Sequence, residues 1–546
     1  MQATHVIEQV AERAHEWARL DDGGKASLLR ACATALYSIR EDWVRTACAT
    51  KQLDPQSNLA GEEWIAGVAV SLRALRLYAE TLEGRHPVES LAVRKIEAEG
   101  QASETMRTVV TAFPRSYTDR LIMPGLRVDL ELEAGVNEPK RERAPTPGLA
   151  LVLGAGNIDS ILVFDLLDQM IRFNRVAVLK FNPINAAIRA PMERAFAPLL
   201  AAGYLGFVDG DAEVGAQLTV HPSVDHIHLT GSNQSFDAMV WGGDPEEARR
   251  RRRGNEPRVR VGVTAELGAV TPILVVPGAW SSNDLRFHAR QLAAMAAHNA
   301  SNNCNAAKLV VTARHWPQRE EFLSLLRKEL AALPVRPAWY PGAAERWQSF
   351  REAYPQAEEL GSKDQRLPWL FIPDVPLRRA ELACKTEAFS PVLAEVSVAA
   401  QTPEEFLARV VAPVNDEVFG SLSCALLAPA HTPALALETA IQGLRYGCVC
   451  VNTWPGLAFG LASPSWGAYP GHDLHSAGSG IGHVHAPLML DRVLRSIVRA
   501  PFRPTRRPVF DPGHRKLLAL GRAWAKYEAQ PSLLRLAALA LPAWRG

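Results

Sequence analysis

From residue 149 onward, short apolar runs alternate with longer amphipathic segments, and this alternation constrains the fold more than any other feature of the sequence. Strand and helix in regular alternation predict right-handed βαβ units and a parallel, doubly wound sheet. Such a sheet binds ligands at the carboxyl ends of its strands. The expected strands are 149–154, 176–180, 205–208 and 226–230, and the expected helices between them are 159–173, 186–201 and 211–219.

A second series of the same kind follows Glu266. Apolar runs at 273–276 and 308–312 predict strands, and periodic segments at 285–299 and 318–332 predict helices. Two consecutive α/β blocks suggest a cofactor-binding domain followed by a catalytic domain.

The segments before these blocks have a different character. Residues 1–85 repeat apolar side chains at helical spacing, whereas prolines mark loops through residues 86–145. Within the second stretch, the alternating residues 126–132 predict a half-exposed strand.

The composition excludes several classes of protein. Of the 546 residues, 47% are hydrophobic and 22% are charged, which is ordinary for a globular chain and argues against disorder or a coiled coil. The net charge of +2 argues against a dedicated nucleic-acid binder. No apolar run reaches the length that crosses a bilayer, and residues 1–20 lack the apolar core of a secretory signal. Seven scattered cysteines suit a reducing compartment, so we expect a cytoplasmic protein.

Two residues have the chemistry and the placement of a catalytic pair. Cys304 lies in a polar connection between an expected helix and an expected strand, where a thiol is accessible to a reactant. Glu266 ends an expected strand among apolar neighbours, which raises the pKa of a carboxyl group and suits it to act as a general base. Taken singly, each residue is as well explained by a structural role.

Other conspicuous groups are better explained as structural. Cys448 and Cys450 form an isolated C-x-C, and His226 and His228 alternate on an expected strand without an acidic partner. The run Arg249–Arg253 predicts a solvated loop. We therefore expect no metal site.

Residues 145–480 resemble the aldehyde dehydrogenase superfamily, as a divergent bacterial-type member. Each matching tripeptide is weak alone, but together they follow the family's order over more than half of the chain. The matching segments are Gly154–Asn157, Val178–Lys180, Leu229–Ser232, Glu266–Gly268, Cys304, Glu387–Pro391, Val414–Gly420 and Val451–Thr453.

The resemblance implies a role for each matching residue. It implies Cys304 as nucleophile, Glu266 as general base and Asn157 as the donor to the oxyanion. The cofactor-binding residues that it implies are Lys180, Gly231, Ser232, Leu267, Glu387 and Phe389.

The implied activity is NAD(P)-dependent oxidation of a small-molecule aldehyde to its carboxylic acid, through a thiohemiacetal and a thioester on Cys304. Relatives that transfer the acyl group to coenzyme A generally lack the glutamate, so Glu266 favours the free acid. Two alternatives stay open. One is an acyl-CoA reductase or CoA-acylating dehydrogenase, and the other is a non-catalytic scaffold of the same fold.

Two departures from the family pattern concern the cofactor. Pro183 occupies the position where NAD-preferring relatives often have a ribose-binding glutamate, so both NAD and NADP are expected cofactors. Phe236 replaces a glycine that lets a helix approach the diphosphate.

The expected fold is α/β and aldehyde-dehydrogenase-like. It combines a doubly wound parallel-sheet cofactor domain, an α/β catalytic domain and a small β element through which a homodimer or homotetramer forms. The expected ranges are 1–114, 146–266 and 446–480 for the cofactor domain, 267–445 for the catalytic domain, and 115–145 with 481–510 for oligomerisation.

The chain continues beyond the resemblance as a basic helical extension, 511–546. From Asp491 to Gly546 twelve Lys and Arg residues face three acids, a net of +9. We expect a helical cap on the N-terminal helices. The alternative is contact with an anionic membrane surface or a long-chain substrate.

Overall fold

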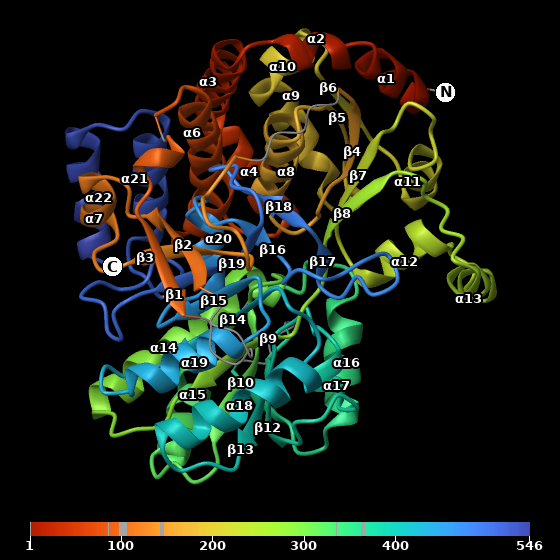
Figure 1. The fold of residues 1–546 in the computed structure, drawn as a ribbon. Helices are drawn as coiled ribbons and strands as arrows, with labels where there is room; N and C mark the ends of the chain where they lie inside the picture. Colours follow the sequence, from red (N-terminus) through yellow and green to blue (C-terminus); the bar gives the residue numbers. More distant parts are fainter. Residues whose placement is uncertain (1, 86, 98–105, 142–146, 335, 362–366) are drawn as a thin grey trace.

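The computed structural model describes residues 2–85, 87–97, 106–141, 147–334, 336–361 and 367–546. It has two α/β parts, each built around its own sheet (Figure 1). The expected domain boundary near residue 145 lies outside the described residues.

The first part contains a six-stranded sheet, four of whose strands, β4 to β7, are those that the alternation from residue 149 predicts. Its strand order is β17-β8-β7-β4-β5-β6, and all pairs are parallel except β17 with β8. The strands are β4 (Leu149–Leu153), β5 (Val176–Lys180), β6 (Leu205–Val208), β7 (His226–Thr230), β8 (Gly262–Glu266) and β17 (Gly480–Ile481).

Helices cover this sheet because its strands are apolar on both faces. Helix α8 (Asp159–Leu167) follows β4 and has every residue buried, since the N-terminal helix α6 (Val70–Leu82) packs over it. Further N-terminal helices, α1 (Gln2–Ala11) and α3 (Asp22–Ser38), extend the same layer (Figure 1).

The second part contains an eleven-stranded mixed sheet of order β1-β2-β3-β19-β15-β14-β9-β10-β13-β12-β11. Its parallel centre is flanked by helices α14 (Ser282–Ala297), α15 (Arg319–Ala331), α18 (Pro403–Glu417) and α19 (Ala434–Gly443). The strands are β1 (Val93–Glu97), β2 (Met106–Phe113), β3 (Arg127–Leu132), β9 (Thr271–Val275), β10 (Ala307–Ala313), β11 (Glu358–Leu360), β12 (Trp369–Val375), β13 (Val392–Val398), β14 (Ser423–Leu427), β15 (Cys448–Val451) and β19 (Val493–Arg499).

Sheet membership differs from the expected division in three places. Strands β1 and β2, expected in the cofactor domain, pair with β3, and β15, also expected there, lies between β14 and β19. Strand β19, which lies in the range expected for oligomerisation, is an interior strand of this sheet between β3 and β15. Strand β15 lies between two other strands because its sequence, Cys-Val-Cys-Val, is buried on both faces and needs a neighbour on each side.

Strand β3 was expected to be half exposed, and it is buried instead. Only Arg127 is exposed, and the two acidic residues face arginines rather than solvent: Glu131 pairs with Arg495 at 2.8 Å, and Asp129 pairs with Arg94 at 2.9 Å. The Arg495 guanidinium also donates to two backbone carbonyl groups, so the ion pair remains hydrogen-bonded inside the protein.

The arginine run forms an exposed helix rather than a loop. Helix α13 (Pro245–Gly254) begins at Asp244, whose side chain accepts hydrogen bonds from two backbone amides, and ends at Asn255 in the left-handed conformation. The pair Arg251–Glu247, one turn apart, supports it further.

The C-terminal extension contains two helices beside the N-terminal layer, α21 (Leu517–Ala529) and α22 (Leu533–Trp544) (Figure 1). Helix α22 leaves Leu534 85% exposed and Trp544 68% exposed. In the described part of the chain, every helix is too short or too polar to cross a bilayer.

One buried carboxylate fastens α21 to the N-terminal helices. Glu528 pairs with Arg73 at 3.1 Å and with Arg76, and it also accepts from the Trp524 indole at 3.0 Å. Burial would raise the pKa of Glu528, but the guanidinium groups of Arg76 and Arg73 outweigh burial and hold that pKa below its ordinary value.

We predict that Glu528→Gln lowers the free energy of unfolding by about 3–5 kcal/mol, because two buried arginines lose their carboxylate. A depressed pKa stabilises the fold above the ordinary glutamate pKa, and this stabilisation is lost as the pH falls through the lower, folded value. The difference between wild type and variant, measured by denaturant unfolding, should therefore shrink in acid.

The control is Glu41→Gln, which removes a solvent-exposed carboxylate 3.7 Å from Arg522, a residue of α21 like Glu528. This substitution should lower the free energy of unfolding by less than about 1 kcal/mol. Equal losses for the two variants would show that Glu528 does not fasten the extension.

Candidate active site

Cys304 lies in a tightly held loop between the short helix η6 (His298–Ser301) and β10. Three consecutive residues before it, Asn299, Ala300 and Ser301, have φ of 55°, 53° and 64°. This left-handed backbone is costly for residues with side chains and persists only when other contacts hold it.

Hydrogen bonds from asparagine and lysine side chains hold this turn. The Asn299 amide donates to the Asn302 carbonyl at 2.9 Å, and the Asn302 amide donates back to the Asn299 carbonyl at 3.2 Å. The buried Lys308 ammonium donates to both the carbonyl and the hydroxyl of Ser301, at 2.6 and 2.7 Å. Burial lowers the pKa of Lys308 to about 7.

The thiol of Cys304 meets the carboxyl group of Glu266 directly. Its Sγ donates to Glu266 Oε1 at 3.2 Å, and the Trp466 indole N–H donates to Glu266 Oε2 at 3.0 Å. Burial raises the pKa of Glu266 to about 7. Burial, and then the charge of Glu266, raise the pKa of Cys304 well above its ordinary value. The thiol is therefore protonated at rest and has a base in contact.

Asn157 joins the same group from the other sheet. It follows β4, and its side-chain amide donates to the Asn302 carbonyl at 3.3 Å, two residues from the nucleophile. Its own carbonyl accepts from Asn299 at 3.0 Å. The structure thus brings together the three residues that the sequence suggested for catalysis.

The expected cofactor residues of the first part lie where strands of the six-stranded sheet end, along the edge formed by the carboxyl ends of the strands. Lys180 ends β5 and is buried, which lowers the pKa of its ammonium group. Gly231 and Ser232 follow β7, where the Ser232 hydroxyl accepts from the Ser235 amide and begins helix α12 (Asn233–Trp241). Leu267 follows β8, and its amide donates to the Ser479 carbonyl at 2.7 Å.

Two further expected residues reach this edge from the second part. Glu387 is buried, which raises its pKa, and its Oε1 has no hydrogen-bond partner among the described residues. A Cβ atom on Gly268 would lie 2.6 Å from the other oxygen, so only glycine admits the carboxyl group there. Phe389 has φ of 43°, and its carbonyl accepts from Arg346 at 3.1 Å. An unpartnered carboxyl oxygen of this kind fits a ribose hydroxyl.

The remaining candidates have structural roles. His228 does have an acidic partner, contrary to expectation: its Nε2 lies 3.2 Å from Asp165 Oδ1 in the buried first sheet. Phe236 is buried under α12 in the hydrophobic core. Within the residues that the structure describes, no group of three His, Cys, Asp or Glu side chains could hold a metal ion.

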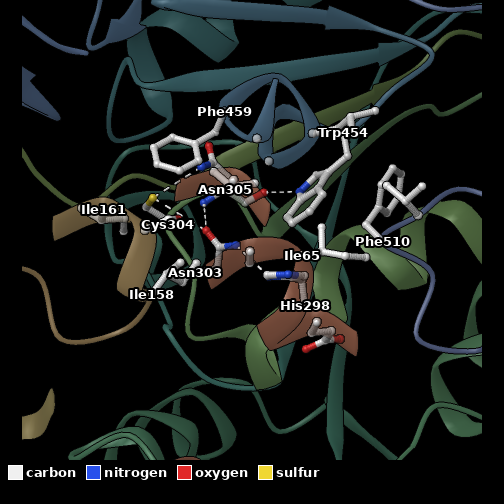
Figure 2. Close-up of a pocket in the computed structure, with 18 of the residues that line it drawn as sticks. Ile65, Ile158, Ile161, His298, Asn303, Cys304, Asn305, Trp454, Phe459 and Phe510 are labelled. Atoms are coloured by element: carbon white, nitrogen blue, oxygen red, sulfur yellow. Dashed lines mark hydrogen bonds between the residues drawn. The ribbon is translucent and has the colours of Figure 1, made fainter. Parts of the chain in front are cut away.

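A pocket opens in front of the thiol. It encloses about 720 Å³ of empty space, including its opening to solvent. Figure 2 shows Cys304 beside Ile161 and Phe459 at one side of the pocket, and Phe510 at the other. The site therefore provides a nucleophile, a base and an amide donor next to a largely apolar cavity.

Sequence reasoning missed two contributors to this site. Trp466 donates a hydrogen bond to Glu266 from β16 (Trp466–Gly467), about 200 residues away along the chain, and Phe510 reaches the pocket from just before the C-terminal extension. No local pattern marks either residue, because both act only through tertiary contact. For the turn before Cys304 the sequence did offer a signal. Asparagines stand at 299, 302, 303 and 305, and asparagine tolerates a left-handed backbone.

Comparison with known proteins gives similarity in structure alone. No protein-family model and no curated protein matches the sequence. The NADP-dependent glyceraldehyde-3-phosphate dehydrogenase from Bacillus halodurans, complexed with NADP, is similar at a TM-score of 0.60 and 16% identity, covering 91% of this chain and 90% of that one. Lactaldehyde dehydrogenase from Escherichia coli is similar at 0.59 and 18% identity, covering 91% and 90%.

A mutant of aldehyde dehydrogenase C from Pseudomonas syringae, complexed with NAD+ and octanal, is similar at a TM-score of 0.59 and 16% identity. The similarity covers 92% of this chain and 90% of that one. Each of these similarities covers about nine-tenths of this chain, which contains both sheets and the loop that carries Cys304. This protein therefore has the fold of the NAD(P)-dependent aldehyde dehydrogenases.

Proposed function

We propose that this protein oxidises an aldehyde to the carboxylic acid with NAD or NADP, using Cys304 as nucleophile. The observation that carries the proposal is the 3.2 Å contact between the thiol and the carboxyl group of Glu266, at the mouth of a pocket large enough for a small molecule. The fold shared with aldehyde dehydrogenases supports it.

The residues at the sheet edge fit a dinucleotide. Gly231 and Ser232 would receive the diphosphate at the start of α12, Lys180 and Glu387 the ribose hydroxyls, and Phe389 with Leu267 the nicotinamide. When bound, the oxidised cofactor supplies the hydride acceptor. Nothing at Pro183 selects between NAD and NADP.

Glu266 and Asn157 divide the work of the first step. Glu266 takes the thiol proton as Sγ bonds to the carbonyl carbon, and the carbonyl oxygen becomes negative. The Asn157 amide and the Cys304 backbone N–H stabilise that oxygen. Loss of hydride from the carbon restores the C=O bond and leaves a thioester on Cys304.

Hydrolysis uses Glu266 again. A carboxyl group whose pKa is about 7 can release the first proton to solvent and then take one from water. The hydroxyl adds to the thioester carbon, the C–S bond breaks, and the sulfur recovers a proton as the acid leaves.

Two alternatives have different products. Transfer of the acyl group to coenzyme A would give acyl-CoA instead of free acid, and a scaffold would give no product. The buried Glu266 beside the thiol favours hydrolysis, because hydrolysis needs a base that activates water, whereas transfer of the acyl group to coenzyme A uses no water.

We also propose that the protein forms a homodimer or homotetramer in the cytoplasm. The seven cysteines, all free, suit a reducing compartment.

We predict that Cys304→Ala abolishes reduction of NAD and NADP by aldehydes. Cys32→Ala is the control, because that thiol is buried in α3 and burial raises its pKa to about 12, which makes it inert. The assay follows absorbance of the reduced cofactor with and without coenzyme A. Aldehyde oxidation by Cys304→Ala would contradict the proposal, and an acyl-CoA product would favour the first alternative.

We predict that Glu266→Gln still forms reduced cofactor in a burst, but turns over at least about 100-fold more slowly, because an amide cannot take a proton from water. Stopped-flow absorbance separates the burst from the steady state. Equal loss of both phases would mean that Glu266 serves only the thiol.

We predict that Trp466→Phe shifts the acidic limb of the pH–rate profile to higher pH, by roughly half a pH unit. The lost indole N–H stabilises the ionised Glu266, so its removal raises the pKa of that carboxyl further. Turnover near neutral pH should fall about two- to threefold and recover at high pH. An unshifted profile with uniformly lower rates would indicate a structural role only.

A further inference from the structure

We infer that the pocket in front of Cys304 accepts aldehydes with an uncharged, apolar chain, and that the C-terminal extension sets the chain length. The inference rests on the proposed function, since it names the substrate class of the same site. Three observations carry it: the lining of the pocket, its charges, and the origin of one wall.

Most of the residues that line the pocket are apolar. Side chains from the π-helical turn η2 (Trp64–Ala69), the start of α8 and helix α20 (Pro455–Gly460) surround the cavity (Figure 2). Each methylene buried there should raise affinity about three- to fourfold until the cavity is filled. The apolar side chains include Ile65, Val70, Ile158, Ile161, Leu457 and Phe459.

The charges in the pocket argue against anionic substrates. Glu62 lines it, and burial there is outweighed by Arg336, which pairs with Glu62 and holds the pKa of that carboxyl below its ordinary value. His298 also lines it, and burial lowers the pKa of the imidazole, so it is neutral. No lysine or arginine is among the described lining residues. A phosphate or carboxylate group would thus be buried beside a carboxylate that is already paired, with no lysine or arginine of the lining to pair with it.

One wall of the pocket comes from the C-terminal extension and from the two residues that come directly before it. We call Val509, Phe510 and Trp524 the extension wall. The Phe510 ring lies 5.1 Å from the Trp454 ring, and the Trp454 indole donates to the Asn305 carbonyl at 2.6 Å. The wall is thereby tied to the residue that follows the nucleophile.

The extension wall is fixed at both ends. Beside Phe510, Asp511 pairs with Arg290 of α14 at 2.8 Å. At the other end, Trp524 donates to the buried Glu528, which the arginines of α6 hold. A wall held in this way limits the length of the bound chain instead of yielding to it.

The test uses the full-length protein and two readouts. Binding of n-alkanals from butanal to decanal, and of glyceraldehyde 3-phosphate, is measured by calorimetry on the Cys304→Ala variant, which cannot react. Chain-length profiles of kcat/KM are measured on enzyme with Cys304 intact. We expect affinity to rise with chain length to a maximum and glyceraldehyde 3-phosphate to bind at least about 100-fold more weakly than the best alkanal.

Variants locate the wall. Phe510→Ala should move the maximum to longer alkanals, and Ala66→Phe, which fills the opposite lining, should move it to shorter ones. Phe502→Ala is the matched control, because Phe502 lies in the same segment but packs against Trp280, edge to face, and against His288. It should leave the maximum unchanged.

Preference for glyceraldehyde 3-phosphate over alkanals, or a Phe510→Ala profile identical to that of Phe502→Ala, would overturn the inference. If Phe510→Ala does not fold, an unmoved maximum in Ala66→Phe overturns it equally. Alkanals that bind Cys304→Ala with rising affinity, while wild type reduces neither NAD nor NADP, would uphold the pocket and refute the proposed function.

Discussion

The contact between the Cys304 thiol and the Glu266 carboxyl group depends on the burial of Glu266, which keeps water from that carboxyl group while the thiol faces the pocket. In water the carboxyl would be ionised at neutral pH and already hydrogen-bonded to solvent. Burial raises the pKa of Glu266 to about 7, so the group can gain and lose a proton within one cycle. One indole hydrogen bond from Trp466 limits this rise. The rest of the site is arranged around this pair.

Keeping the pair buried requires both sheets. Glu266 comes from the end of β8 in the first sheet, and Cys304 precedes β10 in the second. The left-handed turn before Cys304 aims the loop, and it persists because Lys308 and the asparagines satisfy its backbone groups. Asn157 then links that loop back to the first sheet. A shift of one sheet against the other would separate all of these contacts together.

The pocket likewise depends on contacts between distant parts of the chain, here with its C-terminal part. Trp454 connects the residue after the nucleophile to Phe510, and Glu528 fastens the helix that follows. The two buried acids of the tail are paired with arginines of other parts of the chain: Glu528 with Arg73 and Arg76, and Asp511 with Arg290. Among the exposed apolar side chains of α22, Trp544 lies under the Arg506 guanidinium, 5.0 Å from the ring centroid.

The sequence by itself determined the parallel first sheet, because apolar runs alternating with helical periodicity have few other solutions, and it placed Glu266, Gly231 and Lys180 at strand ends. The order of the motifs also singled out Cys304 and Asn157. Only the tertiary structure decided which sheet β1, β2 and β15 join, that β3 is buried, and that Trp466 and Phe510 reach the site. The physical reason is that local periodicity records which face of a segment is buried, whereas the partner that buries it is chosen by packing between residues hundreds of positions apart.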